Sequence, residues 1–298
     1  MRLFNNTNID FVGKSAVAKF LSMALIIAGL ASLAMKGGPA LSIDFTGGTI
    51  AQLQFNKAVD VSELRTKLAE NGFESSEIIT FGSSNEVLIK TQFSGANSEL
   101  ESNLRTAIKS EFQVRRVESV GPKIGKELQS DALSAILLSL LLILIYISFR
   151  FDRFYAYGSV VALIHDVLIT MGIFSLLSIE IDLTIVAAFL TIVGYSLNDT
   201  IVVFDRIREN VIKHARESLD SIVNISLNRT LGRTIVTSLT TFVVVLSLFL
   251  FGGEVIKNFA FALIVGVFVG TYSSIYVASP VMMYFEKKAI AKNNKKYD

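Results

Sequence analysis

The sequence predicts a polytopic α-helical membrane protein with six transmembrane helices and one extracytoplasmic α+β domain between helices 1 and 2. Of its 298 residues, 51% are hydrophobic, and its mean hydropathy lies well above zero. Soluble domains rarely combine these properties. Six apolar segments reach the length of about 20 residues that crosses a bilayer. They are Ala16–Met35, Asp131–Phe149, Tyr155–Ile179, Leu183–Phe204, Gly232–Phe251 and Asn258–Phe285.

The chain divides into four parts on the same grounds. A cytoplasmic N-terminus and the first helix occupy residues 1–35, and a polar insert follows at 36–130. The other five helices occupy 131–285 with an amphipathic cytoplasmic connection at 205–230, and a basic cytoplasmic tail occupies 286–298. The first apolar run is long for a secretory signal, so we expect a retained membrane anchor.

Arginine and lysine predict the orientation of the helices. They gather before the first helix, after the second, after the fourth and in the tail, whereas the other two short loops hold only Lys257. Short loops rich in these residues stay in the cytoplasm, so we expect both termini there and the insert outside. The residues that decide this are Arg2, Lys14, Lys19, Arg150, Arg153, Arg206, Arg208, Lys213, Arg216, Arg229, Arg233, Lys287, Lys288, Lys292, Lys295 and Lys296.

The insert has the pattern of a small ferredoxin-like domain. Strand-like and helix-like segments alternate in the order βαββαβ, which is the split βαβ arrangement. The segments are Thr49–Phe55, Val61–Asn71, Glu77–Phe81, Glu86–Phe93, Ser98–Phe112 and Gln113–Val120. This part contains no His or Cys, so we interpret it as a solvated docking or polypeptide-contacting domain rather than a catalytic one.

Two short motifs lie where this domain joins the membrane part. Asp44 is followed at a short distance by Gly47 and Gly48, just after the first helix, and Gly121-Pro122 precedes the second helix. A glycine pair permits backbone conformations closed to other residues, and proline fixes the backbone. We interpret both motifs as hinge elements; ordinary turns are the alternative.

Asp199 is the first candidate for a functional residue. It lies within an apolar segment that spans the membrane, in its inner third, where an ionised carboxylate costs roughly 2.5–3.5 kcal/mol of insertion free energy. Chains rarely accept that cost unless the group faces a protein interior or a water path for protons or ions. Tyr195 shares its helical face, and Asn198 precedes it.

Arg233 begins the fifth span on the same inner side, and Thr237 continues its helical face. Desolvation raises the pKa of a carboxylate, and a neighbouring arginine lowers it. Movement of Arg233 relative to Asp199 therefore provides a way to load and release a proton. The alternative is a static Asp–Arg pair that only locks two helices together.

His165 and Asp166 lie near the middle of the third span. Asp166 carries the same insertion cost as Asp199, and histidine titrates near neutral pH. The pair therefore either extends a proton path or forms hydrogen bonds to neighbouring helices. The sequence favours neither alternative over the other. Neighbouring residues on a helix diverge by about 100°, so both cannot face one site equally well.

Gly266 and Gly270 belong to a repeat of small residues in the sixth span, which predicts close helix packing, more readily within the chain than with a partner. The connection at 205–230 is amphipathic and is expected on the inner membrane surface. Its basic residues are mixed with acidic ones, so we expect no binding to nucleic acid. The tail has no periodicity and is expected to be disordered and to lie near anionic lipid.

With these residues in place, the chain resembles a known family. The decisive segment is Gly194–Asn210 (GYSLNDTIVVFDRIREN), together with Arg229-Thr230 and Arg233-Thr234. With the six spans, the outer domain and the two junction motifs, it is similar to the SecD–SecF family of protein-export membrane proteins. This family belongs to the resistance–nodulation–division superfamily, and the similarity is to its smaller subunit, SecF.

The resemblance implies a function that the residues alone do not. Together with SecD, such a protein uses the proton gradient to drive late steps of preprotein export across the bacterial inner membrane. Asp199 and Arg233 match the family's proton path, and His165 and Asp166 match its third-span motif. Implied partners are SecD, the SecY-E-G channel, other Sec accessory membrane proteins, unfolded preprotein and the lipid bilayer. No cofactor is expected, and protons are the coupling ion.

Three other functions compete with this one. Half of a drug or lipid exporter would require a second six-span half in the same chain, and a membrane scaffold would not need the charge of Asp199. An enzyme would need a nucleophile–base pair or a metal set, which this sequence with no Cys and two His does not suggest. An intramembrane aspartyl protease built on Asp166 and Asp199 would need flanking motifs that are missing.

Overall fold

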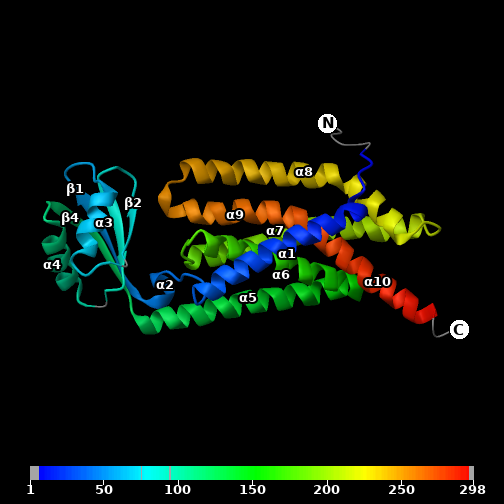
Figure 1. Cartoon of the computed structure of the whole chain (residues 1–298), viewed down its shortest axis with the longest axis horizontal. Helices are drawn as coiled ribbons and strands as arrows, with labels where there is room; N and C mark the ends of the chain where they lie inside the picture. The colour runs from blue at the N-terminus through cyan, green and yellow to red at the C-terminus, as the bar shows by residue number, and fades with distance from the viewer. Residues whose placement is uncertain (1–6, 75, 94, 295–298) are drawn as a thin grey trace.

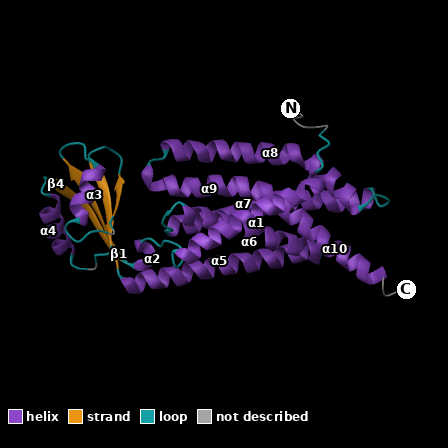
Figure 2. Cartoon of the chain, in the orientation of Figure 1, coloured by secondary structure: helices purple, strands orange, loops and turns teal. Residues whose placement is uncertain are grey.

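The computed structural model describes residues 7–74, 76–93 and 95–294. Long helices lie side by side in one bundle, and a small sheet domain stands at one end of it (Figure 1). Figure 2 shows that all the strands lie in this domain and that the bundle is helical. The first helix begins and the last helix ends far from the sheet domain, so both lie on the side expected to be cytoplasmic.

Six helices are long and apolar enough to cross a membrane, which confirms the predicted spans. Five of them are α1 (Phe11–Met35), α5 (Pro122–Arg150), α6 (Arg153–Leu176), α7 (Leu183–Lys213) and α8 (Leu219–Phe251). The sixth comprises α9 (Glu254–Ser273), a π-helical turn η1 (Ser274–Ala278) and α10 (Ser279–Asn294). Pro280 follows η1 and lacks the amide hydrogen of a regular helix, which explains a wide turn at this place.

The outer domain has the predicted βαββαβ order. Its elements are β1 (Gly48–Phe55), α3 (Val61–Ala69), β2 (Glu77–Thr80), β3 (Glu86–Thr91), α4 (Asn97–Ile108) and β4 (Phe112–Val120). The strands form one antiparallel sheet in the order β2-β3-β1-β4. Alternate residues of β1 and β3 are buried beneath α3 and α4, as the two-residue period of a strand requires.

The predicted amphipathic connection at 205–230 is continuous with the two spans that it joins. Helix α7 continues to Lys213 and α8 begins at Leu219, so the two spans extend beyond the membrane as an antiparallel hairpin. No glycine or proline stops either helix at the end of its apolar stretch. The connection was expected on the inner membrane surface, but its apolar residues Ile207, Ile222 and Val223 are buried inside the protein.

The tail also differs from the expectation of a chain without regular structure. Helix α10 extends to Asn294, because the residues beyond the membrane are good helix formers without glycine or proline. Lys287 forms an ion pair with Asp220 of α8 at 2.5 Å, which ties the helix to the hairpin. Residues 295–298 and Arg2, which contributed to the orientation, lie outside the described residues.

The segment before α1 is bound to the end of α8 that lies far from the sheet domain. The Asn224 side chain accepts hydrogen bonds from the amides of Phe11 and Val12 at 2.9 and 3.1 Å. It also donates one to Asp10 at 2.9 Å. Hydrogen bonds from the Gly13 amide and from Asn224 lower the pKa of Asp10, which caps α1. The first helix is thus anchored by side chains from the fifth span.

Candidate functional site

Asp199 lies inside the bundle, on α7 where it packs against α8 and α9. Its side chain is only 3% exposed. Ser238 of α8 and Thr271 of α9 lie beside the carboxylate, and their hydroxyls are hydrogen-bonded to each other at 2.6 Å. Within the described part of the chain, Asp199 Oδ2 makes no hydrogen bond. A buried carboxylate with an unpaired oxygen is costly when ionised, so its charge state depends on the groups that approach it.

Arg233 acts on Asp199 through its charge and not through contact. The two charges interact, but among the ion pairs of the described residues, none within 4.0 Å joins them. The guanidinium group of Arg233 is exposed on α8 and lines a polar hollow of about 370 Å³ between α7 and α8. Asn198 and Arg229 line the same hollow, so it lies in the half of both helices that is farther from the sheet domain.

The two remaining polar candidates occupy different environments. The Tyr195 hydroxyl is buried and makes no hydrogen bond within the described residues. Thr237 donates to the carbonyl oxygen of Arg233 at 2.9 Å, one helical turn back. The structure therefore brings Asn198 and Asp199 on α7 near Arg233 on α8, without a direct contact between the two charges.

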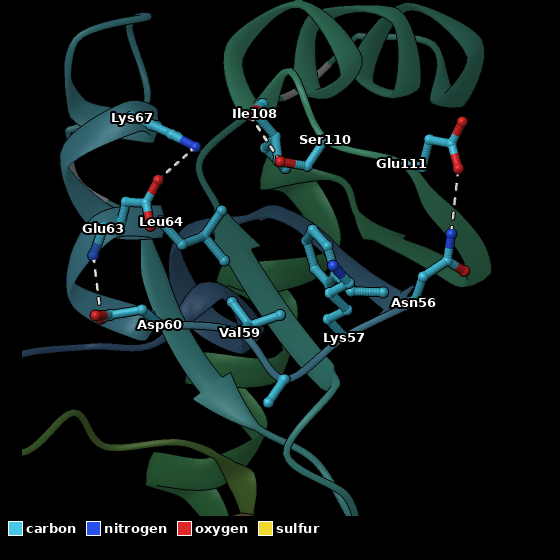
Figure 3. A pocket seen from close by; sticks show the side chains of 12 residues that line it. Asn56, Lys57, Val59, Asp60, Glu63, Leu64, Lys67, Ile108, Ser110 and Glu111 are labelled. Atoms are coloured by element: carbon cyan, nitrogen blue, oxygen red, sulfur yellow. Dashed lines mark hydrogen bonds and ion pairs between the residues drawn. The ribbon is translucent and has the colours of Figure 1, made fainter.

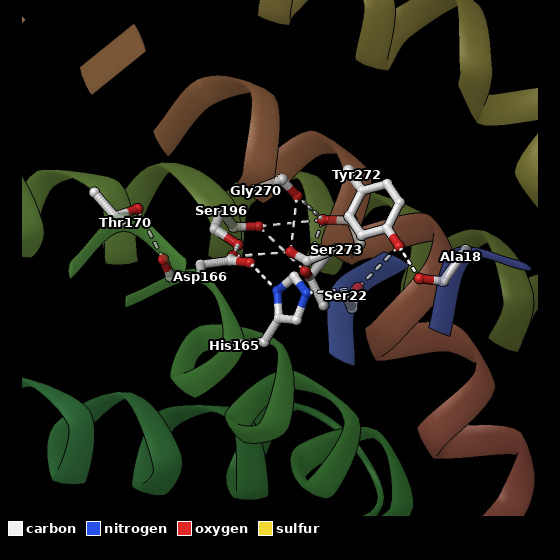
Figure 4. A network of polar contacts seen from close by, with 11 residues as sticks. Ala18, Ser22, His165, Asp166, Thr170, Ser196, Gly270, Tyr272 and Ser273 are labelled. Atoms are coloured by element: carbon white, nitrogen blue, oxygen red, sulfur yellow. Dashed lines mark hydrogen bonds and ion pairs between the residues drawn. The ribbon is translucent and has the colours of Figure 1, made fainter. Parts of the chain in front are cut away.

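His165 and Asp166 belong to a separate buried network (Figure 4). His165 is 5% exposed and Asp166 is 0% exposed, and their side chains contact each other at 2.8 Å. The carboxylate of Asp166 accepts hydrogen bonds from Ser196 of α7 at 2.5 Å and from Ser273 of α9 at 2.8 Å. Both side chains thus face protein, although they are adjacent on one helix.

Sequence reasoning missed most members of this network. Ser22, Ser196, Tyr272 and Ser273 are uncharged polar residues in predominantly apolar spans, and membrane helices tolerate such residues without a functional reason. Their common signal is that buried hydroxyls on different spans need partners. Only the structure tells which hydroxyl meets which.

The two junction motifs meet at one joint. A β-carbon on Gly47 would lie 2.8 Å from Pro122 Cα, and Gly47 has φ 81°, so glycine is required there. Asp44 accepts a hydrogen bond from the Leu183 amide at the start of α7, at 3.1 Å. Gly121, by contrast, has φ −67° and open space around it, so its conformation does not require glycine.

Gly266 and Gly270 pack against α7 of the same chain. A β-carbon on Gly266 would lie 2.2 Å from Ile192 Cγ1, and one on Gly270 would lie 2.9 Å from Ser196 Cβ. The close-packing seam is therefore internal, and it brings α9 near enough to α7 for Ser273 to reach Asp166.

The outer domain carries two further features on its surface. A hollow of about 380 Å³ lies where β1 leads into α3 (Figure 3). Lys67 forms an ion pair with Glu63 at 2.7 Å in its lining, and Glu111 accepts a hydrogen bond from Asn56 at 3.2 Å. Among the described residues no group of three metal-ligating side chains occurs, and the lining contains no nucleophile–base pair.

The second feature is a charge cluster between the domain and the membrane part. Lys90 on β3 forms an ion pair with Glu77 on β2 at 2.8 Å. Glu180 in the loop before α7 interacts electrostatically with both residues. Burial and the charge of Glu77 raise the pKa of Glu180. Burial works to lower the pKa of Lys90, but the hydrogen bond and the charges of the carboxylates outweigh it and raise this pKa.

Comparisons with known families give a consistent result. A family model described as "Protein export membrane protein SecD/SecF, C-terminal" matches residues 100–288, and a second one, "SecD/SecF GG Motif", matches residues 35–59. The second match covers the motif that forms the joint.

Relatives along the whole chain include two proteins named "Protein translocase subunit SecF". The one from Calditerrivibrio nitroreducens is 46% identical over 92% of this chain and 93% of its own length. The one from Thermodesulfovibrio yellowstonii is 44% identical over 98% of this chain and 99% of its own length.

Among solved structures, the crystal structure of SecDF from Thermus thermophilus, described as a translocon-associated membrane protein, superposes with a TM-score of 0.84 at 40% identity. The match covers 96% of this chain and 40% of the SecDF chain. A SecDF structure in a super-membrane-facing form gives a TM-score of 0.76 at 39% identity, and covers 98% and 40% of the two chains. This chain therefore spans less than half of the SecDF polypeptide that it matches.

Proposed function

The chain belongs to the SecF family of protein translocase subunits, and on this premise we propose that it couples proton movement to late steps of preprotein export. In this proposal it resides in the bacterial inner membrane with both termini in the cytoplasm. It works with SecD beside the SecY-E-G channel and other Sec accessory membrane proteins, and its substrate is unfolded preprotein outside the membrane. It is a non-enzymatic subunit that uses protons as the coupling ion.

The environment of Asp199 is the observation that carries the proposal. A carboxylate that is 3% exposed lies on a spanning helix, and one of its oxygens has no hydrogen bond within the described part of the chain. Arg233 lies close enough for its charge to act on Asp199 but does not contact it. A change in the position of Arg233 would therefore alter the affinity of Asp199 for a proton, which is the requirement for a carrier.

The polar hollow supports a route from the cytoplasmic side. It is lined by both acidic and basic side chains between α7 and α8, and Arg233 stands at its border. Polar groups at this depth are expected to face protein or water rather than lipid. A proton held at Asp199 would then exchange with the cytoplasm through this hollow when Arg233 moves away from Asp199.

The free energy available from protons is sufficient for a conformational change of moderate size. One charge crossing a potential of 100 mV yields roughly 2.3 kcal/mol. This biases an equilibrium between two arrangements of the outer domain if protonation favours one of them. The joint at Gly47 and Pro122 transmits such a change, because it connects the domain directly to the start of α5.

SecD is the proposed partner for the membrane part. This chain matches 40% of the SecDF polypeptide, and its helix α8 exposes Arg233 along an outer face that also bears Leu239 and Thr240. An arginine exposed to hydrocarbon is costly. We therefore place the SecD half against this face of α8.

The decisive experiment measures export of a periplasmic preprotein in cells that lack the native subunit. The cells receive the unaltered chain, Asp199→Asn or Arg233→Met at matched membrane abundance. We expect both variants to lose most of the export that the subunit supports, while they still co-purify with SecD. Each removes one charge from the carrier, and Asp199→Asn cannot bind or release a proton.

Matched controls are available in the same chain. Asp131→Asn removes an exposed carboxylate from α5, and Arg216→Met removes an exposed arginine from the turn after α7. Both should export normally. Full export by Asp199→Asn would leave Asp199 a structural residue and favour a scaffold over a proton-coupled subunit.

A further inference from the structure

The network around His165 and Asp166 contains four polar contacts in a line (Figure 4). His165 Nδ1 lies 2.8 Å from Asp166 Oδ1, and His165 Nε2 lies 2.9 Å from Ser22 Oγ. Ser22 Oγ lies 2.9 Å from the Tyr272 hydroxyl, which lies 2.5 Å from the carbonyl oxygen of Ala18. The line therefore joins α6 to α1 and α9.

The direction of each hydrogen bond follows from the chemistry of the end groups. The Ala18 carbonyl only accepts, so Tyr272 donates its one hydroxyl proton to it. Ser22 must then donate its own proton to Tyr272, because two oxygens at 2.9 Å need a proton between them. Ser22 has no proton left for the ring, so His165 Nε2 is the donor to Ser22.

The other end of the line needs a proton as well. Asp166 Oδ2 accepts hydrogen bonds from Ser196 and from Ser273, whose single hydroxyl proton is shared with the Gly270 carbonyl at 3.1 Å. Oδ1 is left facing His165 Nδ1. A neutral imidazole and an ionised carboxylate together carry one titratable proton. The contact of His165 Nε2 with Ser22 and the contact of Nδ1 with Asp166 each need one, which makes two. The pair therefore holds one additional proton, and its position on Nδ1 or on Oδ1 does not change this count.

A neutral, singly protonated ring beside an ionised Asp166 does not satisfy the geometry. If its proton lay on Nδ1, Ser22 would have to donate to Nε2, and then either the contact with Tyr272 or the one with Ala18 would lack a proton. Two buried acceptors would face each other in that case, which is unfavourable. Loss of the additional proton thus breaks one link between α6, α1 and α9.

The surroundings of the pair contain few other groups that titrate. The side chains that meet it are Ser22 from α1, Ser196 from α7, and Tyr272 and Ser273 from α9. The Tyr272 ring also stacks on the imidazole at 6.0 Å between centroids. Among these neighbours only Tyr272 is titratable, and none carries a charge.

We propose that His165 and Asp166 form a second proton-binding site in the membrane part, separate from Asp199, whose proton fastens α6 to α1 and α9. The additional proton is stabilised because the hydrogen bonds from Asp166 to Ala18 can all form only when it is bound. It stands whether or not Asp199 carries protons for export, because it is argued from different residues.

The test uses the fact that the chain contains two histidines, at positions 165 and 214. The full-length chain is labelled with ¹⁵N-histidine and purified in lipid nanodiscs, and His214→Gln assigns the remaining signals to His165. We expect the Nε2 of His165 to resonate as a protonated nitrogen at neutral pH, with a second proton shared between Nδ1 and Asp166. An Nε2 that resonates as an unprotonated nitrogen would overturn the proposal.

Tyr272→Phe provides the second measurement. Without the hydroxyl, Ser22 is free to donate to Nε2, and the two remaining contacts need no additional proton. We expect Nε2 of His165 to resonate as an unprotonated nitrogen at neutral pH in this variant, because Ser22 then donates to it. Thr170→Val is the matched control, since the Thr170 hydroxyl donates to the backbone carbonyl of Asp166 at 2.8 Å, and it should leave the signals of His165 unchanged.

The two proposals fail in different ways. An Asp199→Asn variant that exports normally would refute coupling through Asp199 and leave the spectra of His165 untouched. Identical Nε2 signals of His165 in Tyr272→Phe and in the unaltered chain would refute the second proton site, whatever the export assay shows. A variant that does not fold still leaves the spectrum of the unaltered chain as a test.

Discussion

At the scale of single residues, Gly29 and Gly172 set the distance between α1 and α6. A β-carbon on Gly29 would lie 2.6 Å from Gly172 Cα, and one on Gly172 would lie 2.8 Å from Gly29 Cα. Only backbone atoms are in contact there, so no side chain can change its conformation to make room for a β-carbon. The same approach lets Ser32 of α1 reach Ser175 of α6 at 2.8 Å.

Gly29→Ala is therefore expected to destabilise the bundle by about 1–3 kcal/mol, the usual cost of overpacking. The melting temperature of the purified protein in detergent should fall, although alanine favours helix more than glycine does. Gly194→Ala is the control, because a β-carbon on Gly194 meets nothing within 4 Å. Equal melting temperatures for the two variants would show that α1 shifts without cost.

Individual residues also show what the sequence can and cannot predict. Asp199, Arg233, His165 and Asp166 are detectable, because ionisable groups in apolar spans are costly wherever they lie. Their partners are not, since contacts such as Ser22 with His165 depend on how distant helices pack. The absence of a direct contact between Asp199 and Arg233 also required the structure.

At the scale of elements, the sheet domain is fastened to the membrane part by short contacts at its base. Gly47 and Gly125 pack backbone to backbone against the start of α5 and the helical turn at Ile43–Thr46. Leu41 forms an isolated parallel β-bridge with Ile181 in the loop before α7. The charge cluster of Lys90, Glu77 and Glu180 lies at the same seam. Its protonation state therefore affects the stability of the contact between the sheet domain and the membrane part.

Glu180 makes the stability of this seam depend on pH. Its pKa in the folded protein lies above the ordinary value of 4.5, so the folded state binds the proton more tightly than the unfolded one. Folding stability therefore falls as pH rises through the window between these two values. Lys90 contributes nothing in this window, because its own pKa is raised above 10.5.

Glu180→Gln should remove this part of the pH dependence and raise the melting temperature above the window, since a neutral side chain no longer faces Glu77. Melting temperatures measured from pH 4.5, the ordinary value, up to neutrality test this. Glu74→Gln, at an exposed position of the same domain, serves as the control. A curve for Glu180→Gln parallel to that of the unaltered protein would contradict the expectation.

Elements were predicted more reliably where periodicity was strong. The six spans and the βαββαβ order follow from apolar length and alternation, and the structure confirms them. The ends of α7, α8 and α10 were not predicted, because amphipathic residues beyond a membrane continue a helix as readily as they begin a new one. Packing of the α7–α8 hairpin decides between these two outcomes.

At the scale of the whole molecule, α8 is incompletely covered by its own chain. Leu239 is 56% exposed and Val244 is 69% exposed, whereas Val245 on the opposite face is 7% exposed. The exposed face continues to Arg233, which lipid does not solvate. The position of this surface supports a second membrane protein against it, as proposed for SecD.

A photo-reactive amino acid at Leu239 should therefore form a covalent adduct with SecD in membranes that contain both proteins. The same residue at Val245 should react only within this chain, because that position faces the bundle. Adducts are detected as a shift in apparent mass on a denaturing gel. If position 239 reacted only with lipid while another helix formed the SecD adduct, the partner would lie on a different face.

The π turn at Ser274–Ala278 gives the last span a tolerance for changes in chain length. In a regular helix, deleting one residue rotates everything beyond it by about 100°, which would turn Met282 and Met283 out of the core where they are buried. Inside the wide turn, the same deletion converts it into an ordinary turn and keeps both flanking faces in register. Insertions and deletions that would ruin the helix elsewhere can therefore accumulate at this point.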